Sequence, residues 1–200
     1  MANAFGAAGP RAPRLLLMLG PPGIGRTHLL EAIVARARDR HAAEAIVLTN
    51  GNDLVQALIA AIRGSEDDSI WRRFGQAAVI AVDDLHVLAD KPVTQRETGH
   101  HLGLAVERGA RVACAAGCGP SRIPVLADAV RAAPPGRVIE MRRPRRDQMM
   151  QILTGMARAA DFTLDAQTLG SMAGRCHGDV RRGIGALARV RFVASGDERR

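Results

Sequence analysis

A glycine-rich segment near the start of the chain has the residue types and spacing of a phosphate-binding loop. It runs Gly20-Pro21-Pro22-Gly23-Ile24-Gly25-Arg26-Thr27 and fits the pattern G-x-x-x-x-G-K-[ST], except that Arg26 replaces the lysine. In such a loop, glycines let successive backbone N–H groups converge on a phosphate, and the following helix adds partial positive charge. The Thr27 hydroxyl is then expected to ligate Mg²⁺. The alternative is a plain strand-to-helix turn.

Two neighbouring carboxylates follow a buried apolar run farther along the chain. The run 77–82 is wholly apolar and ends at Asp83 and Asp84, which is typical of a central strand whose carboxyl end meets a phosphate loop. One carboxylate there serves a magnesium ion, and its neighbour orients an attacking water. We assign Asp83 to Mg²⁺ and Asp84 to the catalytic role at the water. A solvated acidic turn is the alternative.

Arg26 departs from the pattern at the position that contacts phosphate. A guanidinium grips phosphate oxygens bidentately, but it is larger than an ammonium and is not a compact point charge. We therefore expect nucleotide binding to be kept and efficient hydrolysis to suffer. The chain has a single lysine, Lys91, so a general replacement of lysine by arginine is the other interpretation.

Short apolar runs alternating with helical patterns must position these residues. Strands are predicted over 14–19, 45–49, 77–82, 112–115 and 138–141. Helices are predicted between them, from apolar residues that recur every three or four positions, over 27–40, 53–62, 94–108 and 125–132. Strands separated by helices imply an α/β fold, in which a five-stranded parallel sheet carries helices on both faces.

The chain changes character near 142–144. Beyond this point only helical patterns occur, over 145–160, 165–173 and 179–194, with Asp165 and Asp179 as expected N-caps. The sequence therefore predicts three parts, which are a flexible N-terminal segment (1–13), an α/β nucleotide-binding domain (14–143) and a small helical domain (144–200).

The composition excludes several classes of protein. The chain has 200 residues, 47% hydrophobic and 24% charged, which is typical of globular proteins. No apolar run approaches the ~20 residues of a membrane span, no secretory signal is expected, and three cysteines are too few for a disulfide scaffold. We expect a cytoplasmic protein with no membrane partner. The net charge of +8 suits nucleic acid or an acidic protein face, or confers solubility alone.

The order of these motifs resembles the AAA+ ATPase domain of the bacterial DnaA/Hda family, a replication initiator and its shorter regulatory relative. The resemblance rests on the segments GRTHLLEAI (25–33), NDLVQAL (52–58), VDDLHVL (82–88) and DVRRGIGAL (179–187). Further residues at the family's spacing are Gln95, Glu97, His100, Glu107 and Gly109. The resemblance implies a P-loop AAA+ fold with a small C-terminal helical lid.

The resemblance also implies a ligand and its contacts. The ligand is ATP or ADP with Mg²⁺, which is held by Thr27 and Asp83. Arg181 is expected to reach the phosphates from the lid. The full set of expected nucleotide-binding residues is Gly20, Gly23, Ile24, Gly25, Arg26, Thr27, His28 and Arg181. The implied partners are a replication initiator or another AAA+ subunit, with DNA, a sliding clamp or further copies of the chain as other candidates.

Departures from the family leave the activity open. The loop after the fourth strand has Ala115, Ala116 and Gly117 where the family has polar residues, and the family's arginine finger falls at Ala132, beside Arg131. We therefore expect a protein of replication initiation or its regulation, with weak or absent ATP hydrolysis. The alternatives are a non-catalytic adaptor that binds another AAA+ protein or DNA, and an ATPase of the helicase-loader type.

Three smaller features receive structural interpretations. Trp71 and Phe74 are interpreted as core anchors, and the three cysteines as incidental thiols rather than zinc ligands. Six arginines near the predicted domain boundary form either an anion-binding patch or a solvated linker, namely Arg131, Arg137, Arg142, Arg143, Arg145 and Arg146.

Overall fold

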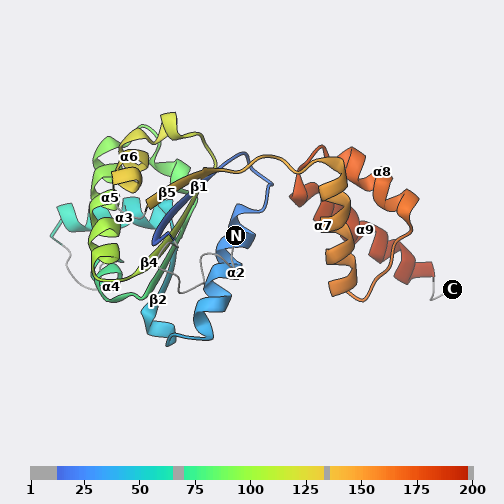
Figure 1. Cartoon of the computed structure of the whole chain (residues 1–200), viewed down its shortest axis with the longest axis horizontal. Helices are drawn as coiled ribbons and strands as arrows, with labels where there is room; N and C mark the ends of the chain where they lie inside the picture. The colour runs from blue at the N-terminus through green and yellow to red at the C-terminus, as the bar shows by residue number, and fades with distance from the viewer. Residues whose placement is uncertain (1–12, 65–69, 133–135, 198–200) are drawn as a thin grey trace. The chain divides into compact units, whose positions relative to one another are not determined.

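The structure is a computed structural model that describes residues 13–64, 70–132 and 136–197 (Figure 1). Contacts divide the chain into two compact units. The first comprises Met1–Gly20 and Arg26–Met141, and the second comprises Pro21–Gly25 and Arg142–Arg200. The predicted N-terminal segment, 1–13, lies outside the described residues except for Pro13. Each unit is described by itself below.

A five-stranded sheet organises the first unit. Its strands are β1 (Leu15–Leu19), β2 (Ile46–Asn50), β3 (Val79–Asp83), β4 (Arg111–Ala116) and β5 (Gly136–Glu140). The order is β2-β3-β4-β1-β5, and every pairing is parallel. The predicted α/β fold with a five-stranded parallel sheet is confirmed. Because all strands run the same way, their carboxyl ends share one edge, where Asp83, Ala116 and Gly20 lie.

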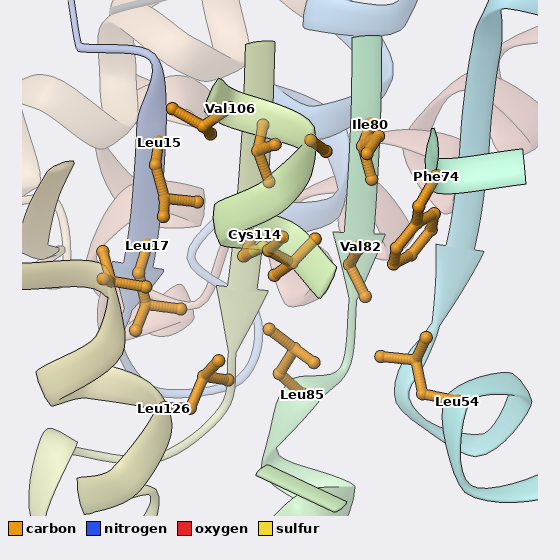
Figure 2. Packing of buried hydrophobic residues seen from close by; sticks show 14 of the residues in the cluster. Leu15, Leu17, Leu54, Phe74, Ile80, Val82, Leu85, Val106, Cys114 and Leu126 are labelled. Atoms are coloured by element: carbon orange, nitrogen blue, oxygen red, sulfur yellow. The ribbon is translucent and has the colours of Figure 1, made fainter. Parts of the chain in front are cut away.

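Helices cover both faces of the sheet (Figure 1). They are α2 (Arg26–Arg38), α3 (Gly51–Ile62), α4 (Ile70–Gln76), α5 (Pro92–Glu107) and α6 (Pro124–Ala132), with short 3₁₀ turns at Ala43–Ala45, Leu85–Leu88 and Pro120–Arg122. Side chains alternate across β1, so that Leu16 belongs to the core on the α2 side of the sheet and Leu17 belongs to the core on the side of α3 to α6. Figure 2 shows the core that contains Leu17, in which Leu54, Phe74 and Leu126 also take part.

Helix α4 is absent from the predicted elements. It has only seven residues, which is too short for a helical period to stand out in the sequence. The interpretation of Trp71 and Phe74 as core anchors is confirmed, because Phe74 is fully buried in the sheet core and Trp71 packs against it. The remaining predicted helices and strands are all present, with ends shifted by a few residues.

Three helices make up most of the second unit. They are α7 (Arg146–Ala159), α8 (Ala166–Cys176) and α9 (Val180–Asp197). Their apolar faces share a core that includes Met149, Leu153 and Leu187. Both predicted N-caps are confirmed: Asp165 accepts from the Thr168 amide at 2.8 Å, and Asp179 accepts from the Arg182 amide at 3.1 Å. Within the described ranges, no helix combines the length and apolarity needed to cross a membrane.

Candidate functional site

The first turn of α2 meets the end of β3 through a hydrogen bond. The Thr27 hydroxyl donates to Asp83 Oδ2 at 2.6 Å. Asp83 is half-buried at the end of the strand, whereas Thr27 is exposed. The structure therefore brings together the two residues that were predicted, from separate motifs, to hold Mg²⁺.

Asp84 follows in an unusual backbone conformation. Its φ is 51° and its ψ is 34°, the left-handed region that costs a non-glycine residue energy. Its amide donates to Asp83 Oδ1 at 2.7 Å, and its side chain is exposed. A Cβ atom at Gly51 would lie 2.6 Å from the Asp84 carbonyl oxygen, so a glycine is needed where α3 starts beside this turn.

A polar cavity of ≈ 420 Å³ adjoins these carboxylates within the first unit. Its lining comprises Thr27, Leu30, Glu31, Leu48, Thr49, Asn50, Asn52, Asp53, Asp83 and Asp84. Asn50 and Asp53 form a capping box at the start of α3, in which the Asn50 side chain accepts from the Asp53 amide at 3.2 Å. The box caps the start of α3 at the rim of the cavity, and Asp84 forms part of the lining.

Arg26 lies at the ends of β1 and β4. Its buried guanidinium donates from Nη1 to the carbonyl oxygen of Gly20. The other arm, Nη2, reaches the loop after β4, where a Cβ atom at Gly117 would lie 3.2 Å from it. His86 also contacts this loop. Its Nδ1 lies 3.4 Å from the Gly117 amide and 3.6 Å from Asp84 Oδ1.

His86 Nδ1 can serve only one of these neighbours at a time. As an acceptor from the Gly117 amide it must be unprotonated, whereas an ion pair with Asp84 requires a proton on it. His86 Nδ1 therefore lies between the Gly117 amide and the carboxylate predicted to polarise water, and contacts one of them at a time.

The middle of the phosphate loop belongs to the second unit. Gly23 and Gly25 have φ values of 80° and 95°, which favour glycine and are typical of a loop that turns its amides inward. The Val180 amide donates to the Gly23 carbonyl oxygen at 2.6 Å. A Cβ atom at Gly23 would lie 2.8 Å from Asp179 Oδ2. The start of α9 is therefore attached to the loop by a main-chain hydrogen bond and lies close to it through the Asp179 side chain.

Ile24 contributes to a second cavity in this unit. Its side chain is buried and lines a space of ≈ 520 Å³ together with Arg142, Pro144, Gln148, Gln151 and Ile152. The lining combines aliphatic groups, two side-chain amides and the Arg142 guanidinium.

All the predicted nucleotide contacts stay predictions, and two of them are exposed side chains. His28 is exposed and lies 3.8 Å from Glu31 Oε2, one turn along α2. Arg181 is exposed in the first turn of α9.

The arginines near 131–146 have partners of their own. Arg131 pairs with Asp128 at 2.9 Å, Arg145 lies 3.7 Å from Asp147, and Arg146 donates to the Gly170 carbonyl oxygen at 3.1 Å. The Ala132 side chain, where the family's arginine finger would fall, lies outside the described residues. Three of the six arginines thus have a local structural role, and the anion patch stays a prediction.

Trp71 of α4 and the buried thiol of Cys114 were also assigned structural roles from the sequence. Trp71 stacks on His101 with ring centroids 4.6 Å apart and an interplanar angle of 18°, so this face of the indole is covered. Burial, followed by the neighbouring His100, lowers the pKa of His101. Burial raises the pKa of the Cys114 thiol. Among the described residues, no three His, Cys, Asp or Glu side chains gather into a metal-binding group.

The donor set at Thr27 and Asp83 fits magnesium. A hydroxyl and a carboxylate are the hard oxygen ligands that Mg²⁺ prefers, and this ion usually takes few protein ligands and completes its shell with water and phosphate. Their contact at 2.6 Å places both oxygens at one point on the sheet edge. These two residues would therefore hold the ion jointly.

Sequence reasoning gave no role of their own to His86 and Gly51, treated Gly117 only as a departure from the family, and missed the approach of Asp179 to the loop. His86 and Gly117 each follow the end of a predicted strand, which is the available signal, because ligand-contacting residues gather there in parallel sheets. Asp179 was predicted only as a cap.

Comparison with known proteins identifies the family. The family model described as the bacterial DnaA ATPase domain matches residues 4–134, more than half of the chain. The chromosomal replication initiator protein DnaA of Lacticaseibacillus casei (strain BL23) is 27% identical over 200 residues, covering 98% of this chain and 44% of the relative. The chain thus spans less than half the length of such relatives.

Solved structures agree with the fold. Domain III of DnaA from Thermotoga maritima superposes with a TM-score of 0.80 at 18% identity, covering 98% of this chain and 82% of the other. A structure described as replication initiator DnaA bound to AMPPCP and single-stranded DNA gives a TM-score of 0.76 at 18% identity, covering 94% of this chain and 59% of the other.

Proposed function

Because the chain belongs to the bacterial DnaA ATPase-domain family, we propose that it binds ATP or ADP and acts in DNA replication initiation or its regulation. The observation that carries this proposal is the 2.6 Å contact between Thr27 and Asp83. It joins a phosphate loop to a strand-end carboxylate on a parallel sheet, which is the arrangement that P-loop proteins use for Mg²⁺ and nucleotide. A cytoplasmic location belongs to the same proposal.

Different residues are proposed to bind the phosphates, the magnesium ion and the attacking water. The loop amides around Gly23 and Gly25 bind the phosphates, and Thr27 with Asp83 hold the ion. When bound, Mg²⁺ would neutralise charge on the phosphate oxygens. Asp84 orients a water from the adjoining cavity of ≈ 420 Å³, and Arg181 reaches the phosphates from α9.

Hydrolysis is proposed to be weak or absent. The last two residues of β4 and the first residue after it are Ala115, Ala116 and Gly117, so these positions have no polar side chain to orient the terminal phosphate. Arg131 is paired with Asp128 on its own helix. An arginine finger supplied in trans is worth about 10³–10⁵ in rate, so a chain without one serves better as a nucleotide-dependent switch than as an efficient ATPase.

A non-catalytic adaptor is the second candidate, and one contact favours it. The Arg26 guanidinium donates to the carbonyl oxygen of Gly20, so one arm of this cation already has a partner within the protein. An adaptor would keep the fold and bind another AAA+ protein or DNA without turnover.

Partners follow from the family and the charge. The relative bound to single-stranded DNA and the net charge of +8 support contact with DNA phosphates. Stacking of bases on Trp71 is disfavoured because His101 covers the ring. Another AAA+ subunit, a replication initiator or a second copy of this chain would be recognised in the nucleotide-bound conformation, and a sliding clamp is a further candidate.

The test is isothermal titration of the purified protein with Mg·ATP and Mg·ADP, with phosphate release followed on the same sample. Micromolar binding, about −8 kcal/mol, with little phosphate release supports the nucleotide-dependent switch. Rapid release stimulated by single-stranded DNA favours the helicase-loader type of ATPase. Failure to bind either nucleotide overturns the proposal and leaves the adaptor.

A further inference from the structure

Helix α9 has apolar residues beyond those that its own bundle buries. One stripe, which includes Val180 and Leu187, packs into the core shared with α7 and α8. Beside this stripe, α9 and the end of α7 form a groove of ≈ 600 Å³, called here the α7–α9 groove. Its lining comprises Met156, Ala160, Ile184, Leu187, Ala188, Arg191 and Phe192. These residues are distinct from those proposed to contact the nucleotide.

Large apolar side chains are exposed at the α7–α9 groove. Phe192 is 80% exposed and Ile184 is 49% exposed. The side chains of Ala160 and Ala188, which also line the groove, are short and leave space beside them. Covering an aromatic ring next to such a space is favourable, because it removes apolar surface from water, and exposed apolar patches of this kind mark interaction sites.

The spacing along α9 matches the contact face of a second helix. The lining residues of α9 recur every three or four positions from Ile184 to Phe192, which is about 12 Å of helix. A partner helix in a groove presents its apolar side chains at positions i, i+3 or i+4, and i+7, over a similar length. Met156 has a flexible thioether side chain, which adapts to the shape of an inserted group. The groove therefore fits an amphipathic helix.

The charge around the groove favours an acidic helix. Arg191 belongs to the lining, and Arg189 is exposed two residues before it on α9. Across α7 and α9 there are six arginines and two carboxylates, namely Arg146, Arg158, Arg181, Arg182, Arg189, Arg191, Asp147 and Asp197. One further carboxylate, Asp161, follows Ala160 in the sequence. A second copy of this chain is disfavoured as the occupant, because it would bring the same basic helices to the contact.

We propose that the α7–α9 groove binds an amphipathic helix of a protein partner, with its apolar side chains in the groove and Asp or Glu residues beside the arginines of α9. Phe192 is the apolar anchor, since exposed aromatic rings next to a hollow carry much of the binding free energy in interfaces. Contacts between guanidinium and carboxylate groups select the acidic helix over a basic one. Binding at this groove does not require nucleotide, so it can succeed or fail independently of the function proposed above.

The experiment measures the binding of two designed peptides to the whole chain by fluorescence anisotropy. Both peptides have about 16 residues, with leucine at every third or fourth position. The remaining positions are glutamate and alanine in one peptide, and lysine and alanine in the other. The glutamate peptide should bind with a dissociation constant of about 10–100 µM, and the lysine peptide at least about tenfold more weakly. This preference should shrink when NaCl is raised from ~50 to ~500 mM, because salt screens exposed charges.

Substitutions on α9 test whether the peptide occupies the groove. Phe192→Ala should weaken binding of the glutamate peptide about tenfold. Ala188→Glu should weaken it further, because the added side chain fills the groove and repels the acidic peptide. Val193→Ala is the matched control, since Val193 is the neighbouring apolar residue, is 66% exposed and does not line the groove; its effect should be less than about twofold. All three side chains are exposed, so thermal unfolding should be unchanged in each variant.

Several results would overturn this assignment. Absence of glutamate-peptide binding, or equal binding of the glutamate and lysine peptides, removes the acidic helix as the occupant. Peptide binding that Phe192→Ala leaves unchanged places the peptide elsewhere on the chain. Self-association in sedimentation equilibrium that Phe192→Ala abolishes assigns the groove to a second copy. Binding to phosphatidylglycerol vesicles that the same variant loses, without peptide binding, assigns it to a lipid surface.

Discussion

Two corners of the same sheet edge differ in how closely they follow the P-loop pattern. At the end of β3, Thr27 and Asp83 are in contact at 2.6 Å, and Asp84 is exposed beside them. At the ends of β1 and β4, Arg26 replaces a lysine and Gly117 offers no side chain. The first corner keeps the groups proposed to bind metal and water, whereas the second has changed the group proposed to contact phosphate.

The difference separates two requirements of an ATPase. Binding of a magnesium nucleotide needs oxygen donors and loop amides, and the first corner retains the oxygen donors. Fast hydrolysis also needs fixed cationic and polar donors around the terminal phosphate in its transition state. A protein altered only in the second corner is expected to bind well and turn over slowly.

Among the substitutions in the first corner, Asp84→Asn is expected to have the largest effect on the rate of hydrolysis. If the protein hydrolyses ATP, the rate should fall about 10²–10⁴-fold, because an amide cannot accept the proton of the attacking water. Phosphate release under single-turnover conditions measures it. Asp90→Asn is the control, since Asp90 is also exposed and has a φ of 61° but pairs with Arg122 instead.

An unchanged rate for Asp84→Asn would contradict the assignment of this residue. If the unsubstituted protein shows no turnover at all, the comparison shifts to partner binding. An adaptor should then bind its partner equally well with aspartate or asparagine at this position.

Asp83→Asn should remove most of the advantage that magnesium confers on nucleotide binding. Loss of one anionic oxygen at the ion is expected to weaken magnesium affinity about 10–100-fold. Titrations with Mg·ADP and with ADP in EDTA measure the difference. Asp128→Asn is the control, because Asp128 pairs with Arg131 on α6. Equal affinities for Asp83→Asn and the unsubstituted protein in magnesium would place the ion elsewhere.

Thr27→Val should have a smaller effect on the same quantity. The valine keeps the shape but removes the hydroxyl that contacts Asp83, and loss of one hydrogen-bonding ligand is expected to weaken Mg·ADP binding about threefold to tenfold. Thr27→Ser restores the hydroxyl and should restore the affinity. If Thr27→Ser bound Mg·ADP as weakly as Thr27→Val, the methyl group of Thr27 would matter and the hydroxyl would not.

Local patterns in the sequence predicted the sheet and the first corner because both depend on short stretches of chain. Each strand is an apolar run, and Thr27 and Asp83 stand at fixed offsets from such runs. The second corner was not predictable in this way. The place of the Arg26 side chain beside Gly20 and Gly117 depends on the pairing of β1 with β4, which are far apart in the sequence.

The same limit explains the missed contact in the second unit. Asp179 has the sequence context of an N-cap, and it does cap α9. Its approach to Gly23 depends on the fold, which brings the start of α9 to the phosphate loop. The periodicity of apolar residues in the sequence does not predict this approach. Helix α4 was missed for a different reason, since its seven residues complete only about two turns.

His86→Ala tests whether the two corners communicate. His86 lies 3.6 Å from Asp84 and 3.4 Å from the Gly117 amide, but its side chain is exposed, and contacts of this kind contribute little. We expect AMPPCP affinity to fall about twofold to threefold and Mg·ADP affinity to stay the same, measured by calorimetry with His41→Ala as the exposed control. If AMPPCP and ADP affinities fall together, His86 supports the first corner alone. If neither changes, the two corners act independently.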